Sequence, residues 1–533
     1  MTYVITQNCC KDASCVPVCP VDCIRPVSTR GDFGGSEMLF IDPETCIDCG
    51  ACMEECPVDA IYYDEDLPDE LSVFRDINAR YFEQHPLSAR DREPQDEQPP
   101  IEPGSLRVAI VGGGPAACYA AAALTRTAGV EVDLYERLPT PFGLIRAGVA
   151  PDHQHTKSVV GIFGKMFSSE RVACHLNVEI GRDLSHDELA AHHHAVIYAV
   201  GAPHSRELGI PGEQLPGSHP AGDFVGWYNG HPDHAGHRFD LSGDRAVIIG
   251  NGNVALDAAR VLLMAPDDLA ATDAAEHARD ALHHSMIREV VIMGRRGPRH
   301  GAFSVGEFAA LEHLPGIDVV VDTDDLDAQG TDDIETTLKL ELARRFAQRP
   351  STPGNKRIVF RFNVTPSEVH GAGRAEGLTL TDAAGRSERL DARLILRSIG
   401  YRGVPLPGLP FDEVSGVIPN DRGAVTDQHG TAVTGVFVTG WIKRGPRGVI
   451  GTNRSCAEET VAQVWQSFHS GALAQPVGNR DDINRLLSDR GVSPIPWQGW
   501  RAIDAEERRR GTAAQRPRVK MVDVAEMLAT AQK

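Results

Sequence analysis

The 533-residue sequence contains no run of about 18 or more consecutive apolar residues, the length that a helix needs to cross a membrane. Its first ten residues, MTYVITQNCC, lack the basic and apolar leader that directs export. The chain has fewer basic than acidic residues, with 53 Lys and Arg and 74 Asp and Glu, which give a formal net charge of −21. From these absences we expect a cytoplasmic protein with no membrane contact and no nucleic-acid partner.

Cysteine is scarce over most of the chain but crowded near its start. Nine of the twelve cysteines lie between residues 9 and 56, and only Cys118, Cys174 and Cys456 lie elsewhere. Crowding of this kind without an export signal favours metal binding over disulfides. We expect the three outlying cysteines to be small buried apolar residues.

The same part of the chain is strongly acidic. Residues 1–84 contain 17 Asp and Glu against 5 Lys and Arg. Two interpretations stay open, namely a solvated surface or an acidic docking face for a basic redox partner.

Four cysteines have the spacing of a bacterial iron–sulfur site, namely Cys46, Cys49, Cys52 and Cys56. Pro57 directly follows the last of them. In this pattern three thiolates bind one cluster, and the fourth, before proline, binds a second cluster. A tetrahedral zinc site needs two separated pairs of ligands, which this consecutive spacing does not provide. The pattern therefore predicts iron–sulfur clusters rather than zinc.

The pattern also occurs upstream, with Asp12 in the place of one cysteine between Cys9, Cys15 and Cys19. This internal repeat predicts a pseudo-symmetric two-cluster ferredoxin fold. One cluster would be bound by Cys19, Cys46, Cys49 and Cys52, and the other by Cys9, Cys15 and Cys56.

Asp12 affects the type of the cluster at Cys9, Cys15 and Cys56. A carboxylate is a harder and weaker ligand for a fourth iron than a thiolate, so we expect 3Fe-4S at this site and 4Fe-4S at the other. A 4Fe-4S cluster completed by Asp12 or by the adjacent Cys10 stays open. The head resembles the seven-iron ferredoxins over most of its length, although the spacing of its first cysteines differs from theirs.

Residues 106–136 predict a strand, a glycine turn, a helix and a second strand. The turn reads Gly112-x-Gly114-x-x-Ala117. Gly112 permits the tight turn, Gly114 lets backbone N–H groups approach a pyrophosphate, and Ala117 allows close packing of the helix on the sheet. Glu136 ends the second strand, where a carboxylate can accept hydrogen bonds from ribose hydroxyls. The unit predicts a dinucleotide site.

Residues 245–255, RAVIIGNGNVA, repeat the strand and the glycine turn, so one dinucleotide site is nested inside another. The partner strand at 290–293 leads not to an acid but to Arg295 and Arg296. Two guanidiniums can clamp a 2′-phosphate, which a carboxylate would repel. The second site is therefore predicted to bind NADP, which makes FAD the ligand of the first.

The loop that follows Glu136 carries a longer signature, PTPFGLIRAGVAPDH, at residues 139–153. It is similar to the signature of adrenodoxin reductase and of the bacterial ferredoxin–NADP reductases of that type. Trp441 follows Gly440, at a position where many other two-dinucleotide flavoproteins have an aspartate. A tryptophan there resembles the adrenodoxin reductase group. The resemblance covers nearly everything from Leu106 onward.

The resemblance implies two sets of cofactor contacts. For FAD they are Ala116, Glu136, Leu144, Ile180, Trp441, Gly448, Val449 and Ile450. For NADP they are Arg206, Asn251, Gly252, Asn253, Val254, Arg295, Arg296, Glu307 and Gly448. It also implies that His153 and Glu307 lie beside the flavin and nicotinamide rings, where they tune orientation and polarity. Hydride transfer between cofactors needs alignment and exclusion of water more than acid–base chemistry.

The predicted fold class is α/β, with two nested Rossmann-like dinucleotide-binding domains and an N-terminal α+β ferredoxin domain. We predict five segments: the ferredoxin head at 1–84, a flexible linker at 85–105, the first part of the FAD-binding domain at 106–203, the inserted NADP-binding domain at 204–393, and the second part of the FAD-binding domain with a C-terminal extension at 394–533. The linker is rich in Pro and charged residues and has no apolar period, so we expect a mobile tether without a permanent interface.

We predict an NADPH-dependent, FAD-containing ferredoxin–NADP reductase, and the whole chain resembles an actinobacterial-type fusion of a ferredoxin with such a reductase. Hydride would pass from NADPH to FAD, and single electrons would then pass to the clusters of the head or to a separate ferredoxin. The resemblance implies a one-electron acceptor such as a cytochrome P450 system. Two alternatives stay open: an electron-input subunit similar to the small subunit of glutamate synthase, and a non-catalytic electron carrier.

Overall fold

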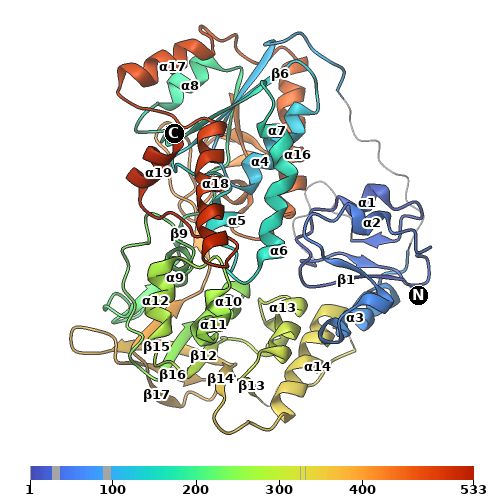
Figure 1. The fold of residues 1–533 in the computed structure, drawn as a ribbon, viewed down its shortest axis with the longest axis vertical. Coiled ribbons are helices and arrows are strands. Elements are labelled where there is room, and N and C mark those ends of the chain that lie inside the picture. The colour runs from blue at the N-terminus through green and yellow to red at the C-terminus, as the bar shows by residue number, and fades with distance from the viewer. Residues whose placement is uncertain (1, 27–35, 88–97, 324–325, 331) are drawn as a thin grey trace.

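A computed structural model describes residues 2–26, 36–87, 98–323, 326–330 and 332–533. Within these ranges, no helix combines the length and the apolar character that a membrane crossing requires. The head lies beside both nucleotide-binding parts, which occupy the upper and lower halves of Figure 1. Within the linker predicted at 85–105, residues 88–97 lie outside the described residues, and the Ile101 N–H donates to the Ala128 carbonyl of the upper part at 2.9 Å.

The upper part is built on a seven-stranded sheet in the order β20-β21-β22-β8-β5-β6-β7. The last five strands are parallel, and β20 and β21 are antiparallel. The strand bounds are β5 Leu106–Val111, β6 Val130–Glu136, β7 Val172–Leu176, β8 Ala195–Tyr198, β20 Asn420–Asp421, β21 Ala424–Thr426 and β22 Ala432–Val438. Strands β6 and β8 flank β5, whereas β20, β21 and β22 follow the lower part in the sequence. The upper part is therefore completed only after the inserted lower part.

Successive residues of β5 alternate between two cores, as the side-chain period of a strand requires. Val108 and Ile110 pack in the core that includes α4 (Pro115–Thr125) and α16 (Thr452–His469). Ala109 and Val111 pack in the core that includes α8 (His186–His192) and α17 (Arg480–Asp489). Both faces of the central strand are thus covered, which explains why it is apolar from Val108 to Val111.

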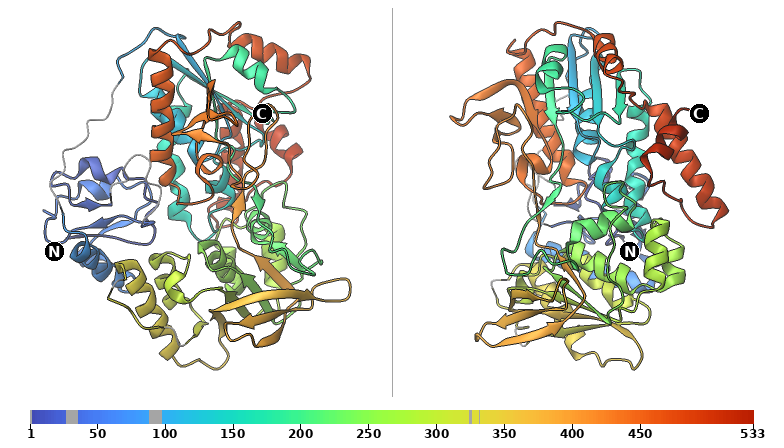
Figure 2. Two further views of the ribbon diagram at one scale, coloured as in Figure 1. Left: turned by 180° about the vertical axis from the view of Figure 1, so that it is seen from behind. Right: turned by 90° about the vertical axis from the view of Figure 1, so that its left-hand side faces the viewer.

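The lower part is built on a six-stranded parallel sheet in the order β10-β18-β11-β12-β14-β13. Its bounds are β10 Ser218–Pro220, β11 Arg245–Ile249, β12 Glu289–Met293, β13 Ile317–Asp322, β14 Lys356–Arg361 and β18 Leu394–Arg397. A three-stranded antiparallel sheet of β15 (Val364–His370), β16 (Gly377–Asp382) and β17 (Ser387–Asp391) packs on one face of this sheet (Figure 2), where Leu378 shares a core with Val247 and Val291.

The predicted domain boundary between residues 393 and 394 is therefore wrong. The strand that begins at Leu394 pairs with β10 and β11 in the lower sheet, not with the upper one. Its apolar sequence suits a buried parallel strand of either sheet, so local pattern could not assign it. The lower part extends at least to Arg397.

The head has the pseudo-symmetry that its cysteine repeat predicts. Each half contains a strand, a cysteine loop, a short helix and a second strand: β1 Tyr3–Ile5, α1 Cys15–Val18 and β2 Ile24–Arg25 in the first half, and β3 Phe40–Ile41, α2 Ala51–Glu54 and β4 Ile61–Tyr63 in the second. β1 pairs with β4, and β2 pairs with β3, so the two halves exchange strands. The helix α3 (Val73–Gln84) then packs against β1 and β3.

The head contacts both nucleotide-binding parts, which contradicts the expectation of a head without a permanent interface. Arg80 on α3 forms two hydrogen bonds of 2.7 and 3.0 Å with Glu341 on α14 (Ile334–Gln348) of the lower part. Ser158 of the upper part donates a hydrogen bond of 2.7 Å to the carbonyl of Pro57. Figure 1 shows α3 beside α14.

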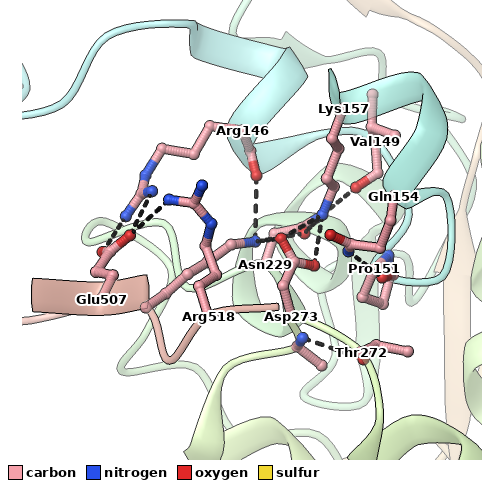
Figure 3. A network of polar contacts seen from close by, with 12 residues as sticks. Arg146, Val149, Pro151, Gln154, Lys157, Asn229, Thr272, Asp273, Glu507 and Arg518 are labelled. Atoms are coloured by element: carbon pink, nitrogen blue, oxygen red, sulfur yellow. Dashed lines mark hydrogen bonds and ion pairs between the residues drawn. The ribbon is translucent and has the colours of Figure 1, made fainter. Parts of the chain in front are cut away.

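A buried ionic network joins the two nucleotide-binding parts through the C-terminal segment (Figure 3). Arg146 on α5 (Gly143–Ala147) donates to both oxygens of Glu507 on α18 (Trp497–Ala513), at 2.9 and 2.5 Å. Lys157 and Lys520 lie 2.7 and 3.0 Å from the carboxylate of Asp273. The relative position of the two parts is thus set by paired charges that are almost wholly withdrawn from solvent.

Candidate active site

The first glycine turn has the geometry that a dinucleotide site needs. Gly112 has φ +108°, and a Cβ there would lie 2.5 Å from the carbonyl oxygen of Ala199, so only glycine fits. Gly114 precedes α4, whose N-terminus carries a partial positive charge at the turn. Ala117 is fully buried within the core beneath the helix. The turn fits a pyrophosphate.

Glu136 lies at the end of β6, next to this turn. Its carboxylate accepts hydrogen bonds from the N–H of Gly113 at 2.7 Å and of Leu138 at 2.9 Å. Burial raises the pKa of Glu136, although these two N–H donors oppose the shift. The carboxylate is thereby held where the sequence predicts a ribose contact.

The other residues implied to contact FAD come from separate segments, and most of these meet near α4. A Cβ on Gly440 would lie 2.6 Å from the Cβ of Ala116, so the segment that carries Trp441 approaches α4 closely. The ring of Trp441 stacks on Tyr401, with centroids 5.9 Å apart. Leu144 on α5 is 48% exposed, whereas Ile180 forms a β-bridge with Leu184 and packs against a separate core.

The second glycine turn repeats the geometry of the first. Gly250 has φ +109°, and a Cβ there would lie 2.0 Å from the carbonyl oxygen of Ser398. Gly252 is the N-cap of α10 (Asn253–Leu263), which includes Val254 in its first turn. Asn251 and Asn253 accept hydrogen bonds from the N–H groups of Ala302 and Ser304, at 3.3 and 2.8 Å. These bonds tie the turn to the segment that leads to Glu307.

Three arginines predicted to contact NADP lie at the solvent-accessible surface. Arg295 and Arg296 follow β12 and are exposed, and within the described part of the chain neither guanidinium has a side-chain partner. Arg206 is exposed and donates through Nε to the carbonyl of Tyr401 at 3.2 Å. All three can reach a phosphate without breaking an ion pair.

His153 and Glu307 lie together, with 3.9 Å between Nδ1 and Oε1. Glu307 is on α13 (Val305–Ala310), and the hydroxyl of Ser304 caps that helix by accepting from the Glu307 N–H at 3.2 Å. Burial and then the Arg260 cation lower the pKa of His153, and burial raises the pKa of Glu307. The structure therefore brings the two predicted residues into one site.

Sequence reasoning missed Asp257 and Arg260, which complete this site. Arg260 donates to Nε2 of His153 at 2.8 Å and to Asp257 at 2.6 Å. Burial raises the pKa of Asp257 to about 6, although Arg260 opposes the shift. A signal was available, because both residues lie on the helix that follows the second glycine turn, where a charged residue at a buried position is unusual.

Four predicted iron ligands line one pocket in the head: Cys19, Cys46, Cys49 and Cys52. Apolar neighbours including Val21, Ile24 and Ile41 form the rest of its wall. Cys23, which has no place in the repeat, also lines this pocket and lies 3.4 Å from Cys19, sulfur to sulfur. Four thiols around an apolar pocket fit an iron–sulfur cluster.

The remaining predicted ligands, Cys9, Cys15 and Cys56, lie near the upper part. Burial raises the pKa of Cys15, and the neighbouring Cys9 and Cys56 sulfurs add to the shift. That these three cysteines bind one cluster stays a prediction. Asp12 is buried, but its carboxylate faces Tyr119 of the upper part.

One cleft joins the three predicted sites. It has a cavity volume of about 70 Å³ and lies where the head meets both nucleotide-binding parts. Its walls include Cys9 of the head, Val449 of the upper part, and Asn253 and Glu307 of the lower part. A predicted iron ligand thus faces residues that are implied to contact both nucleotides.

The chain is similar to known proteins over its whole length. The family described as pyridine nucleotide-disulphide oxidoreductase matches residues 106–296, and the 4Fe-4S binding domain matches residues 39–62. A probable ferredoxin/ferredoxin–NADP reductase of Mycobacterium bovis is 48% identical over 551 residues, which cover 100% of this chain and 95% of the relative. The chain belongs to the ferredoxin/ferredoxin–NADP reductase family. This membership confirms the predicted resemblance.

Other relatives of this ferredoxin/ferredoxin–NADP reductase match its nucleotide-binding parts. The mitochondrial NADPH:adrenodoxin oxidoreductase of Arabidopsis thaliana is 38% identical and covers 80% of this chain, with 95% of the relative covered. The structure of Mycobacterium tuberculosis FprA in complex with NADPH has a TM-score of 0.75 and 42% identity, covering 80% of this chain and 100% of that one. The predicted α/β fold class with a ferredoxin-like head is thereby confirmed.

Proposed function

We propose that the protein is an NADPH-dependent, FAD-containing ferredoxin–NADP reductase that delivers electrons to iron–sulfur clusters in its own head or to a separate ferredoxin. When bound, FAD accepts a hydride from NADPH and returns two electrons one at a time, and each cluster accepts one. The observation that carries this proposal is the cleft in which Cys9, Val449 and Glu307 meet. The relatives named for NADPH and ferredoxin support the choice of substrates.

The two glycine turns have separate roles in this proposal. The first, with Gly112, Gly114 and Glu136, would hold the pyrophosphate and ribose of FAD. The second, with Asn251–Val254, would hold NADP, while Arg295 and Arg296 would bind its 2′-phosphate. A guanidinium pair discriminates NADP from NAD because it gains charge-assisted hydrogen bonds only with the extra phosphate.

His153 and Glu307 would align the reacting rings rather than transfer protons. Arg260 donates to Nε2 of His153, so the single proton of the neutral imidazole is on Nδ1, on the side of Glu307. The two side chains are only 21% and 16% exposed, which limits their contact with water. Alignment and dryness are the two conditions that hydride transfer requires from a protein.

Reduction by NADPH under anaerobic conditions tests this function. NADPH added to the holoprotein should bleach the flavin absorption, and signals of reduced clusters should then grow in the electron paramagnetic resonance spectrum. A bound flavin that NADPH leaves oxidised would identify a non-catalytic electron carrier. Co-purification of a tightly bound larger subunit would instead favour an electron-input subunit. A cytochrome P450 acceptor and a cytoplasmic location stay predictions.

A further inference from the structure

The loop of residues 10–12 in the head is packed directly on the upper part. The N–H of Gly451 donates a hydrogen bond of 2.8 Å to the carbonyl of Cys10. A Cβ at Gly451 would lie 1.9 Å from the carbonyl oxygen of Lys11. Gly451 has an ordinary φ of −68°, so the close approach of the head, not the backbone conformation, excludes a side chain there.

The carboxylate of Asp12 is engaged by residues from two helices of the upper part. The hydroxyl of Tyr119 on α4 donates to one oxygen at 2.5 Å. Arg454 on α16 lies 3.7 Å from the other oxygen and donates at 2.9 Å to the Asp12 carbonyl. The Ser14 hydroxyl also donates to Oδ1 of Asp12, the oxygen that lies nearer to Arg454. Asp12 is only 4% exposed, so these partners replace the water that it loses.

We propose that Asp12 anchors the head to the reductase in the same chain and is not an iron ligand. This inference rests on the proposed function, because it concerns the clusters that the head would hold. To bind iron, the carboxylate would have to leave Tyr119 and Arg454, and the buried Tyr119 hydroxyl would lose its acceptor. The replacement of a cysteine by aspartate in the repeat therefore serves docking, since a thiol cannot pair with both a hydroxyl and a guanidinium in this way.

The anchor acts on the region where the predicted sites meet. Tyr119 lies on the helix that starts at the first glycine turn, and Gly451 directly follows the loop implied to contact both cofactors. Cys9, on the same head loop as Asp12, lines the cleft with Val449. Loss of the anchor should thus separate the cluster of Cys9, Cys15 and Cys56 from the nucleotide sites without altering either glycine turn.

Hydrogen–deuterium exchange of the holoprotein tests the dock, by which we mean the contacts of residues 10–12 with Tyr119, Gly451 and Arg454. In Asp12→Asn and Tyr119→Phe, amide exchange in residues 9–15 and 448–454 should become about tenfold faster or more, as expected for loss of a hydrogen bond to a charged group. Gly451→Ala, which obstructs the loop itself, should have the same effect. Arg490→Gln is the matched control, because Arg490 of the upper part pairs with Glu188 at 2.5 Å and, among the described residues, shares no ion-pair partner with Arg454. Unchanged exchange in all three dock variants would overturn the dock.

Iron content tests the second half of the proposal independently. Asp12→Asn should keep the iron count and the cluster type of the wild-type protein, both measured on anaerobically prepared holoprotein. A loss of about one iron per chain or a change of cluster type would identify Asp12 as a ligand and overturn the proposal. Failure of the proposed function would be distinct, because NADPH would then leave the flavin oxidised in the wild-type protein as well.

Discussion

Nε2 of His153 accepts a hydrogen bond of 2.8 Å from Arg260, which lies on the helix that follows the NADP-side glycine turn. This bond joins the signature loop of the upper part to the lower part, directly beside Glu307 and Asp257. One ring nitrogen of His153 and one carboxylate oxygen each of Asp257 and Glu307 lie within 4.8 Å of one another. Movement of one nucleotide-binding part relative to the other would therefore disturb this site first.

Asp257→Asn should change how activity and stability depend on pH. Because burial raises the pKa of Asp257 to about 6, its ionised form is disfavoured in the folded protein. The stability that its protonated form contributes is present below the unfolded pKa of 3.8 and is lost as pH rises through about 6. The variant should thus be more stable than the wild type at pH 8, by about 1–3 kcal/mol, and equal to it near pH 4.

The matching kinetic readout is the rate of flavin reduction by NADPH between pH 5 and 8. An inflection near pH 6 should be present in the wild type and absent in Asp257→Asn. An inflection that persists in the variant would assign the titration to another group.

Replacing both Arg295 and Arg296 with alanine should weaken NADPH binding selectively. Loss of charge-assisted hydrogen bonds to a 2′-phosphate should raise the KM for NADPH by about ten- to a hundredfold and leave the KM for NADH nearly unchanged. Steady-state kinetics with both nucleotides make the comparison. Arg288→Ala, just before β12, is the control, and equal effects on both nucleotides would contradict the assignment.

Glu37 of the head should weaken NADPH binding while the head is docked. Its carboxylate accepts a hydrogen bond of 2.7 Å from Asn253, in the turn predicted to hold NADP, and burial raises the pKa of Glu37. A negative charge at that place opposes a phosphate. Glu37→Gln should lower the KM for NADPH by about two- to fivefold, consistent with a partly screened charge. The exposed head residue Glu44 provides the control Glu44→Gln, and an unchanged KM in Glu37→Gln would exclude this repulsion.

Glu507→Gln should destabilise the folded chain strongly. Glu507 has no exposed side-chain surface and pairs with both Arg146 and Arg518, so its loss leaves the buried Arg146 guanidinium without its carboxylate, while Arg518 keeps Asp504 at 2.8 Å. We expect the free energy of unfolding to fall by about 3–5 kcal/mol, measured by denaturant titration of the holoprotein. Glu506→Gln, one residue earlier on the same helix, removes a solvent-facing partner of Arg509 and Arg510 and should have a much smaller effect.

The oxidised protein should show the electron paramagnetic resonance signal of a 3Fe-4S cluster. The site of Cys9, Cys15 and Cys56 has three thiols, and Asp12 is engaged elsewhere, so no fourth ligand is in place. Cys10 faces the core of the upper part, and its carbonyl is held by Gly451. A silent spectrum with eight irons per chain, the count of two 4Fe-4S clusters, would contradict this expectation.

Features encoded by short spacing could be predicted from the sequence. Both glycine turns and both cysteine patterns depend on residues within a few positions of each other, and the covalent chain fixes their geometry. Asp12–Tyr119, Glu37–Asn253 and His153–Arg260 join residues more than 100 positions apart, and no local pattern indicates that they meet. The strand that begins at Leu394 shows the same limit, because an apolar strand does not specify its neighbours in a sheet.

Cys49 is the exposed member of its set of four cysteines. Ile47, two residues before Cys49, is 56% exposed. The set of Cys9, Cys15 and Cys56 is instead covered by the dock. Dissolved dioxygen would therefore reach the two sites unequally, and thiolate oxidation follows exposure. In air, iron should be lost first from the site that contains Cys49. The order of oxidative damage would then report which side of the head faces the surroundings in solution.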